Sequence, residues 1–207
     1  MERWDLIAAE RRAFADLVDG LAEEQLAAPS LCERWTVKHV AAHVMVGPTA
    51  SVAGVMKEMA RARFNFNRAN DALAQARVGL PVRELTRRMR DHAESRFSPP
   101  GMDWRAPMAD ILIHSQDVAV PLGLSFERPP EAWRYALDLL ARPKSAKAFG
   151  GRPTRARLEA TDVDWASGDG PLVKGPASAL ALALAGRSAG WERAEGPGLE
   201  CLVGRGE

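Results

Sequence analysis

The sequence predicts an α+β protein, with an N-terminal helical bundle followed by a small C-terminal α/β domain. Up to about residue 142, apolar residues recur at helical spacing between short breaks that contain glycine or proline. After residue 150, alternating residues and glycine turns indicate short strands. Of the 207 residues, 46% are hydrophobic, which is ample for a packed core. We therefore expect a helical bundle over residues 1–142 and a small α+β domain over residues 150–207.

The predicted helices of the bundle are separated by recognisable breaks. Gly20, Gly47-Pro48 and Gly79-Leu-Pro81 each interrupt a helical pattern. Thr36 is a suitable N-cap for the second helix. His39 occupies the position where a capping box needs Glu or Gln, so we expect no capping box there. The expected helices span residues 2–20, 37–46, 49–75, 82–97, 107–121 and 129–140.

The tail of the chain mixes short strands with one helix of small residues. Residues 155–163 alternate in the manner of a strand, and Gly168-Asp-Gly170 predicts a turn before a second strand at residues 172–173. Residues 176–185 predict a helix, and residues 199–203 a short last strand. This pattern differs from the helical front and marks the second domain.

The helix that begins at Pro107 carries the first candidate site residues. Proline is favoured at the first helical position, and Asp110 and His114 then lie one turn apart on a single face. A lone histidine among apolar neighbours is ordinarily a core residue bonded to a neighbour. A buried carboxylate one turn from a buried imidazole needs a partner, however, and a divalent cation can serve both groups.

A third ligand is expected from the helix over residues 37–46, where His43 lies among apolar residues. Three protein ligands, His43, Asp110 and His114, would leave a fourth position for water, which is the pattern of catalytic metal sites. Two imidazoles and a carboxylate suit Zn²⁺, and the same ligands are compatible with Fe²⁺, Ni²⁺ or Mn²⁺. The alternative is that Asp110 and His114 hydrogen-bond to each other in a metal-free protein.

Four other polar residues have weaker signals. Asp117, three residues after His114, is either an acceptor that orients this ligand or an ordinary helix carboxylate. His39 is expected to be partly exposed near the start of its helix, and His92 to face inward on the fourth helix in a structural role. Cys32 has no histidine beside it in the sequence, so we interpret it as a small hydrophobe or a capping thiol.

Charge and cysteine content narrow the possible partners and location. With 28 Lys and Arg against 27 Asp and Glu, the net charge of +1 gives no support to binding of nucleic acid or of an anionic membrane. No stretch approaches the ~18 apolar residues of a membrane span, and the first residues lack the apolar run of an export signal. We expect a cytoplasmic protein, monomeric or homodimeric, in which Cys32 and Cys201 are reduced.

With these residues in view, the sequence resembles the mycothiol-dependent maleylpyruvate isomerase family of actinobacteria, within the DinB-like metal-binding superfamily. In that family, a helical bundle binds a divalent metal through His, Glu and His, and a small α/β domain follows. The resemblance carries these ligands onto His43, Asp110 and His114, with Asp110 one methylene shorter than the Glu of the pattern. It rests on the segments Cys32–Val44, Asp110–Gly123, Ala160–Trp165, Val173–Ala177 and Leu184–Arg187.

The resemblance also implies a mechanism in which the metal takes a small thiol, mycothiol, in its open position. Coordination deprotonates the thiol at neutral pH, which gives a nucleophile that the protein's own cysteines need not supply. The thiolate would add to the double bond of maleylpyruvate in an isomerase, or to another electrophile in an S-transferase. Arg187 is the candidate to hold a substrate carboxylate. Two alternatives stay open: a binding protein of this fold without turnover, and a metal-free structural homologue.

Overall fold

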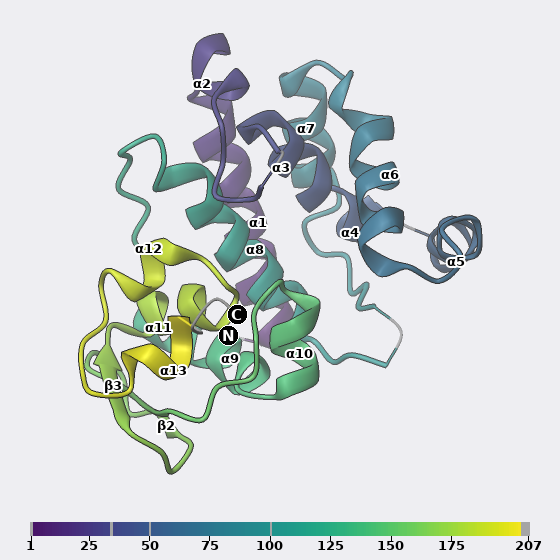
Figure 1. The fold of residues 1–207 in the computed structure, drawn as a ribbon. Coiled ribbons are helices and arrows are strands. Elements are labelled where there is room, and N and C mark those ends of the chain that lie inside the picture. Colours follow the sequence, from purple (N-terminus) through teal and green to yellow (C-terminus); the bar gives the residue numbers. More distant parts are fainter. Residues whose placement is uncertain (1, 34, 50, 100, 204–207) are drawn as a thin grey trace. The chain divides into compact units, whose positions relative to one another are not determined.

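The chain forms two compact units, one ending at Phe126 and the other beginning at Glu127 (Figure 1). The computed structural model describes residues 2–33, 35–49, 51–99 and 101–203. The first unit is helical and the second holds a three-stranded sheet, which confirms the predicted α+β class. The sequence placed the end of the helical domain at residue 142. The structure instead groups α9 (Pro130–Leu140) with the second unit, because it packs against α11 (Ala177–Leu184).

The described part of the first unit holds eight helices, and five of them pack against one another at its centre. α1 packs against α7 and α8, and α3 packs against α6 and α8. None of the helices in the described residues is both long and apolar enough to cross a bilayer. The helices are α1 (Arg3–Asp19), α2 (Glu23–Ala27), α3 (Val37–Val44), α4 (Val46–Thr49), α5 (Val52–Arg61), α6 (Phe66–Val78), α7 (Val82–Asp91) and α8 (Arg105–Ala119).

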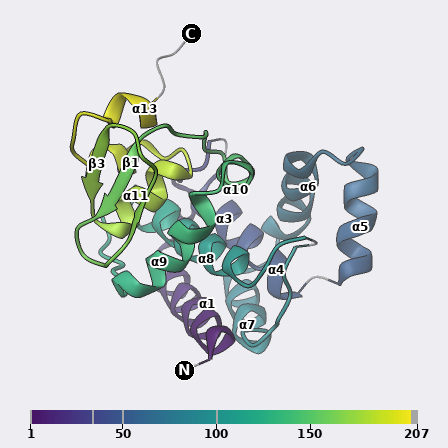
Figure 2. The same cartoon turned by 90° about the horizontal axis from the view of Figure 1, so that it is seen from below.

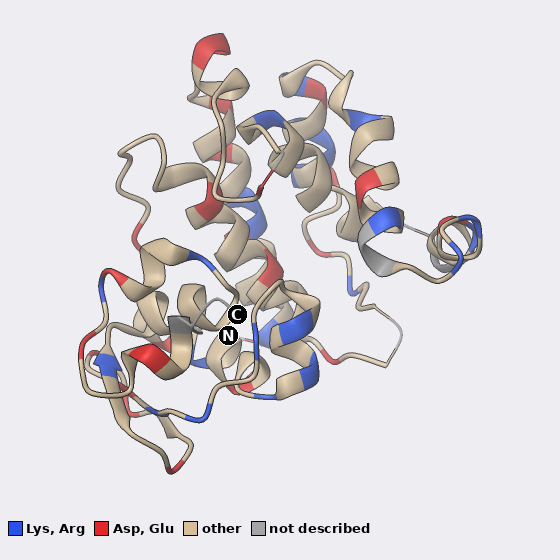
Figure 3. Cartoon of the chain, viewed as in Figure 1, with Lys and Arg blue, Asp and Glu red and all other residues tan. Residues whose placement is uncertain are grey.

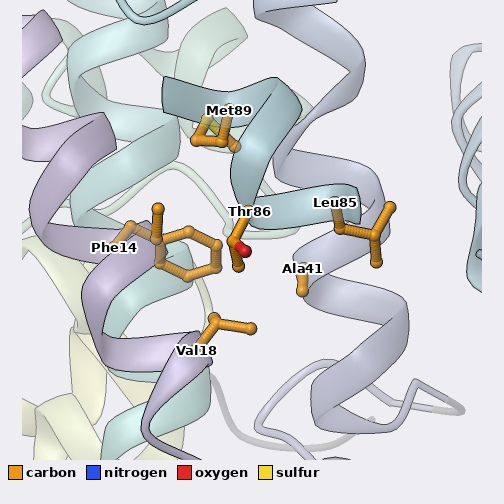
Figure 4. Close-up of a pocket in the computed structure, with 7 residues that line it drawn as sticks. Phe14, Val18, Ala41, Leu85, Thr86 and Met89 are labelled. Carbon is orange, nitrogen blue, oxygen red and sulfur yellow. The ribbon is translucent and has the colours of Figure 1, made fainter. Parts of the chain in front are cut away.

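The core between α1, α3 and α7 is nearly filled. Phe14 and Val18 of α1, Ala41 of α3, and Leu85 and Met89 of α7 meet there and are all buried (Figure 4). The space left between them is about 10 Å³, which is the room that a single water needs. This cavity is therefore a packing void that has no room for a ligand, and the close packing fixes α3 in the position from which it presents His43.

The predicted long helix over residues 49–75 is wrong, because the chain reverses in its middle. α5 ends at Arg61, and both Arg63 (φ 54°) and Phe64 (φ 58°) adopt the left-handed conformation. Asn65 then caps α6, since its Oδ1 accepts a hydrogen bond of 3.0 Å from the Arg68 backbone N–H. The break has no glycine or proline, and Asn65 was the local signal for it.

Two expectations about histidines in this unit are also wrong. Thr36 caps α3 as predicted, but His39 completes a capping box, because its Nδ1 lies 3.4 Å from the Thr36 backbone nitrogen and accepts its hydrogen bond. An imidazole thus takes the place of the usual Glu or Gln. His92 is exposed and not inward-facing, because α7 stops at Asp91 and His92 is its C-cap.

The second unit is built around α11, whose residues are nearly all buried. It lies against β1 (Arg157–Ala160) and β3 (Leu172–Gly175), which pair in parallel, while β2 (Ala166–Ser167) pairs antiparallel with β1 (Figure 2). The strand order is β2-β1-β3. The remaining helices are α10 (Pro143–Ala148), α12 (Ser188–Trp191) and α13 (Leu199–Val203). The segment over residues 199–203 was predicted as a strand and is this last helix.

The contact between α11 and α12 depends on Gly190. A Cβ atom at this position would lie 2.3 Å from the backbone nitrogen of Ala183 and 2.5 Å from the carbonyl oxygen of Ala179. We expect Gly190→Ala to lower the free energy of unfolding by about 1–3 kcal/mol, measured by urea denaturation. Gly79→Ala is the control, because nothing lies within 4 Å of a Cβ there and its φ is −72°. Equal losses in both variants would contradict the close approach of the two helices.

Charged side chains of both signs are interspersed over the helices of the first unit (Figure 3). On α7, for example, Arg87 lies within 2.6–2.9 Å of carboxylate oxygens of Glu84 and Asp91. Such i,i+3 and i,i+4 pairs on an exposed face contribute little to stability and are typical of a solvated surface.

Candidate metal centre

The first unit brings His43, Asp110 and His114 together. His43 lies in the last turn of α3, and Asp110 and His114 lie one turn apart on α8, against which α3 packs. The Nε2 atoms of His43 and His114 each lie 3.5 Å from Oδ1 of Asp110. One ligand atom from each residue lies within 4.8 Å of the other two. The three residues that the sequence predicted therefore share one site.

The spacing of these atoms fits a shared cation better than hydrogen bonds. A hydrogen bond between an imidazole N–H and a carboxylate is usually about 2.7–3.2 Å long, shorter than the distances here. A tetrahedral cation with bonds of about 2.1 Å holds its ligand atoms about 3.4 Å apart. The observed distances of 3.5 Å match that edge, so Asp110 reaches far enough despite its shorter side chain.

The two histidines of the site are largely buried, and the carboxylate of Asp110 is partly exposed. The side chains of His43 and His114 are 10% and 9% exposed, whereas that of Asp110 is 36% exposed. Burial raises the pKa of Asp110, but the adjacent imidazoles of His114 and His43 outweigh it and hold that pKa well below its usual range. Burial lowers the pKa of His114, and Asp110, Asp117 and Cys32 raise it well above its usual value. The carboxylate is thus ionised and able to accept a cation.

Asp117 and Cys32 lie on the far side of the His114 ring from Asp110. Oδ2 of Asp117, which is fully buried, lies 2.8 Å from Nδ1 of His114, three residues before it on α8. The thiol of Cys32 donates to the same oxygen over 3.0 Å, and its sulfur lies 3.7 Å from Nδ1 of His114. A backbone hydrogen bond of 3.1 Å from Leu31 to the Asp117 carbonyl ties the Cys32 loop to α8.

The role of Cys32 therefore differs from the sequence interpretation. No histidine is its neighbour in the chain, but His114 is its neighbour in space, 82 residues away. The Cys32 thiol and the His114 imidazole both use one carboxylate oxygen of Asp117, which leaves Nε2 of His114 directed at Asp110. This is the arrangement in which a metal-binding histidine donates its second N–H to a carboxylate.

His43 is held differently from His114. Its Nδ1 atom is buried and has no hydrogen-bond partner among the described residues. Its ring packs against that of Trp35, with ring centroids 5.0 Å apart, and the Trp35 centroid is also 6.5 Å from that of His114. The indole N–H of Trp35 donates to Oδ1 of Asp71 on α6 over 3.2 Å, which fixes the ring in place. Packing against an aromatic wall, rather than a hydrogen bond, orients His43.

A buried arginine, Arg11, interacts with Asp110 electrostatically and was not predicted from the sequence. Arg11 of α1 is 3% exposed, and its Nη1 donates to the carbonyls of Ala93 and Ser95 over 2.8 and 2.6 Å, just beyond the end of α7. Burial lowers the pKa of Arg11 to about 10, partly opposed by the charge of Asp110. The guanidinium stays charged and adds positive potential near Asp110.

Arg187, the candidate for binding a substrate carboxylate, lies in the second unit and hydrogen-bonds to backbone carbonyls there. Its Nη1 donates to the carbonyls of Phe149 and Ala185, each over 2.6 Å, and it precedes α12 as its N-cap residue. These bonds tie the loop around Gly150 to the end of α11. A role of Arg187 in substrate binding stays a prediction.

Comparison with known proteins identifies the relatives of this fold. Residues 7–98 match the family model described as the mycothiol maleylpyruvate isomerase N-terminal domain. A crystal structure of the mycothiol-dependent maleylpyruvate isomerase is similar with a TM-score of 0.58 at 13% identity, and that of a histidine-to-alanine variant with 0.59 at 14%. Each comparison covers 94% of this chain and 91% of the other. No curated protein sequence matches the chain significantly.

The chain has a helical unit followed in sequence by a unit with a small sheet, and its fold is similar to that of these isomerases over 94% of its length. The match over residues 7–98 and the similar solved structures support the resemblance to the mycothiol maleylpyruvate isomerase family that the sequence predicted. At identities of 13–14%, the solved structures establish the shared fold, and the activity has to be argued from the site itself.

Proposed function

We propose that the protein is a metal-dependent enzyme that uses mycothiol as its nucleophile, as an isomerase of the maleylpyruvate type or as a thiol S-transferase. One observation carries this proposal: an imidazole nitrogen of His43 and one of His114 each lie 3.5 Å from the same oxygen of Asp110, which is the separation of two ligands on a tetrahedral cation, and this carboxylate is partly exposed. Three protein ligands and an accessible fourth position are typical of catalytic sites, and this ligand set suits Zn²⁺.

When bound, the cation would lower the pKa of a coordinated thiol, so that the thiolate is available at neutral pH. The chain supplies the surroundings for that chemistry. Asp117 orients His114 through the 2.8 Å contact at Nδ1, and Trp35 packs against His43 and shields it from water. The exposed side of Asp110 is where thiol and electrophile would enter. The thiolate would add to the double bond of maleylpyruvate, and the displaced π electrons would move onto the conjugated carbonyl as an enolate. Rotation about the resulting single bond, followed by expulsion of the thiolate as the double bond re-forms, would give the trans isomer.

A metal-free homologue is the competing candidate, and the electrostatics of the site provide one argument for it. An ionised Asp110 and a protonated His114 attract each other without any cation. Their 3.5 Å separation is long for a charge-assisted hydrogen bond, however, and the same carboxylate oxygen lies equally far from His43. We therefore favour the metal-dependent function. The location we propose is the reducing cytoplasm of an actinobacterium, which is compatible with Cys32 and Cys201 not being joined in a disulfide.

Cobalt substitution tests this function directly. Protein reconstituted with Co²⁺ should bind one ion per chain, and addition of mycothiol at neutral pH should produce a thiolate-to-cobalt charge-transfer band. The Zn²⁺ form should then consume maleylpyruvate, or a general electrophile such as a chlorodinitrobenzene, only when mycothiol is present. Metal content that stays far below one ion per chain after reconstitution would eliminate the enzyme as described.

A further inference from the structure

We infer that the α5 hairpin, residues 51–68, is a peripheral binding surface for an anionic lipid bilayer. The hairpin comprises α5, the turn that follows it and the start of α6. Met56 of α5 is 45% exposed and Phe64 of the turn is 69% exposed, and these are the two exposed large hydrophobic side chains among those that the structure describes. α5 packs against α6 and lies at the outer side of the first unit (Figure 2).

The backbone at Phe64 is unusual for an aromatic residue. Its φ of 58° lies in the left-handed region, where glycine and asparagine are the usual residues and a bulky side chain costs free energy. The backbone N–H of Phe64 donates to the carbonyl of Met59 over 2.7 Å and so closes the end of α5. A glycine would close the same turn at a lower cost. A ring that is 69% exposed gains little from the fold in return, so we expect it to contact something outside the chain.

The hairpin also carries an excess of positive charge around these apolar side chains. Its cations are all exposed, and they are Lys57, Arg61, Arg63 and Arg68. Its one carboxylate, Glu58, accepts a hydrogen bond of 2.6 Å from Arg61. The other three cations have no ion-pair partner among the described residues. The net charge of +1 for the whole chain conceals this local excess, which the sequence analysis therefore missed.

Cations next to exposed apolar side chains match the chemistry of an anionic bilayer surface. Each Lys or Arg near anionic headgroups strengthens binding by about fivefold, and an apolar side chain gains by entering the boundary between headgroups and acyl chains. Stable peripheral binding generally takes two such signals, and the hairpin has both. With 10 residues, α5 is too short to cross a bilayer, so it would lie on the surface.

Two other occupants fit the hairpin less well. A second copy of the chain would bring the unpaired cations of one hairpin close to those of the other, which is unfavourable. Nucleic acid would match the cations, and a base could stack on Phe64, but Met56 has no part in phosphate contacts or in base stacking. A bilayer accommodates the cations, the aromatic ring and the methionine together.

Sedimentation of the full chain with lipid vesicles tests this surface. Vesicles of phosphatidylglycerol and phosphatidylcholine in equal parts should bind the chain, and pure phosphatidylcholine should bind it at least about tenfold more weakly. Phe64→Gly removes the ring and should weaken binding by about tenfold. This variant should unfold at or above the wild-type temperature, because glycine relieves the left-handed backbone. Arg63→Gln should weaken binding by about fivefold. Arg83→Gln, which removes an exposed cation of α7, is the matched control and should leave binding unchanged.

The outcomes assign the hairpin to one occupant. Weakened vesicle binding in Phe64→Gly, together with retained binding in Phe64→Leu, which keeps an apolar side chain, supports the bilayer. No binding to the phosphatidylglycerol vesicles overturns the proposal, as does binding that Phe64→Gly leaves unchanged. Dimerisation without vesicle binding, observed by sedimentation equilibrium and lost in Phe64→Gly, overturns it in favour of a second copy. Tighter binding of single-stranded DNA than of the vesicles also overturns it. None of these measurements involves metal or mycothiol, so their result is independent of the proposed function.

Discussion

Replacing His43 by alanine should abolish stoichiometric metal binding and mycothiol-dependent turnover. His43 is the one candidate ligand that α3 contributes, so its loss leaves two protein donors, both on α8. We expect the affinity for Zn²⁺ to fall by more than the roughly 100-fold that loss of an orienting partner causes. Competition with a chromophoric chelator measures this affinity independently of any reaction.

The control for this variant has to separate loss of a ligand from loss of packing. His43 is buried against Trp35, so the alanine variant leaves a cavity. His43→Gln keeps most of the volume without an imidazole, and it should also lose the metal while unfolding near the wild-type temperature in chelator. His92→Ala removes an exposed histidine at the end of α7 and should change neither property. Full activity in both His43 variants would refute the ligand assignment.

The sequence was most informative where the signal was local. Pro107 and the apolar run behind it placed α8 to within two residues of its start at Arg105, and the i,i+4 spacing alone put Asp110 and His114 on one face. Thr36 marked the start of α3 correctly for the same reason, since a cap depends on residues within one turn. These features require no knowledge of the tertiary structure.

Features that depend on distant residues could not be predicted in this way. Cys32 lies 82 residues from His114 and 85 from Asp117, so nothing in its own neighbourhood shows that it touches them. The pairing of Trp35 with Asp71 spans 36 residues and is hidden for the same reason. The prediction of a strand over residues 199–203 was wrong for another reason, because five residues are too few to distinguish helical from strand periodicity.

Replacing Asp117 should have the second large effect on metal binding. Its carboxylate is buried, and one of its oxygens contacts both the Cys32 thiol and Nδ1 of His114. Asp117→Asn keeps the shape of the side chain but presents either an amide N–H or a weaker acceptor to Nδ1 of His114. If the Asn amide turns its N–H towards Nδ1 of His114, that nitrogen can no longer carry a proton. The imidazole proton then moves to Nε2, the atom that faces Asp110. We expect the Zn²⁺ affinity to fall by about 10–100-fold, with turnover reduced in proportion at limiting metal.

The comparison with Cys32→Ser shows whether this effect acts through His114. Serine keeps a donor to Oδ2 of Asp117, so that variant should hold metal nearly as well as the wild type. Asp91→Asn, at an exposed position of α7 paired with Arg87, controls for the change of charge and should have no effect on metal affinity. If Asp117 only stabilised α8, turnover of Asp117→Asn would stay low even with excess Zn²⁺. If Asp117 instead orients His114 as a ligand, saturating Zn²⁺ should restore most of the turnover, because the variant has lost affinity for the metal. The tautomer of His114, observed by ¹⁵N NMR of the metal-free chain at a pH high enough to deprotonate the imidazolium, provides the direct readout: the remaining proton should move from Nδ1 in the wild type towards Nε2 in the variant.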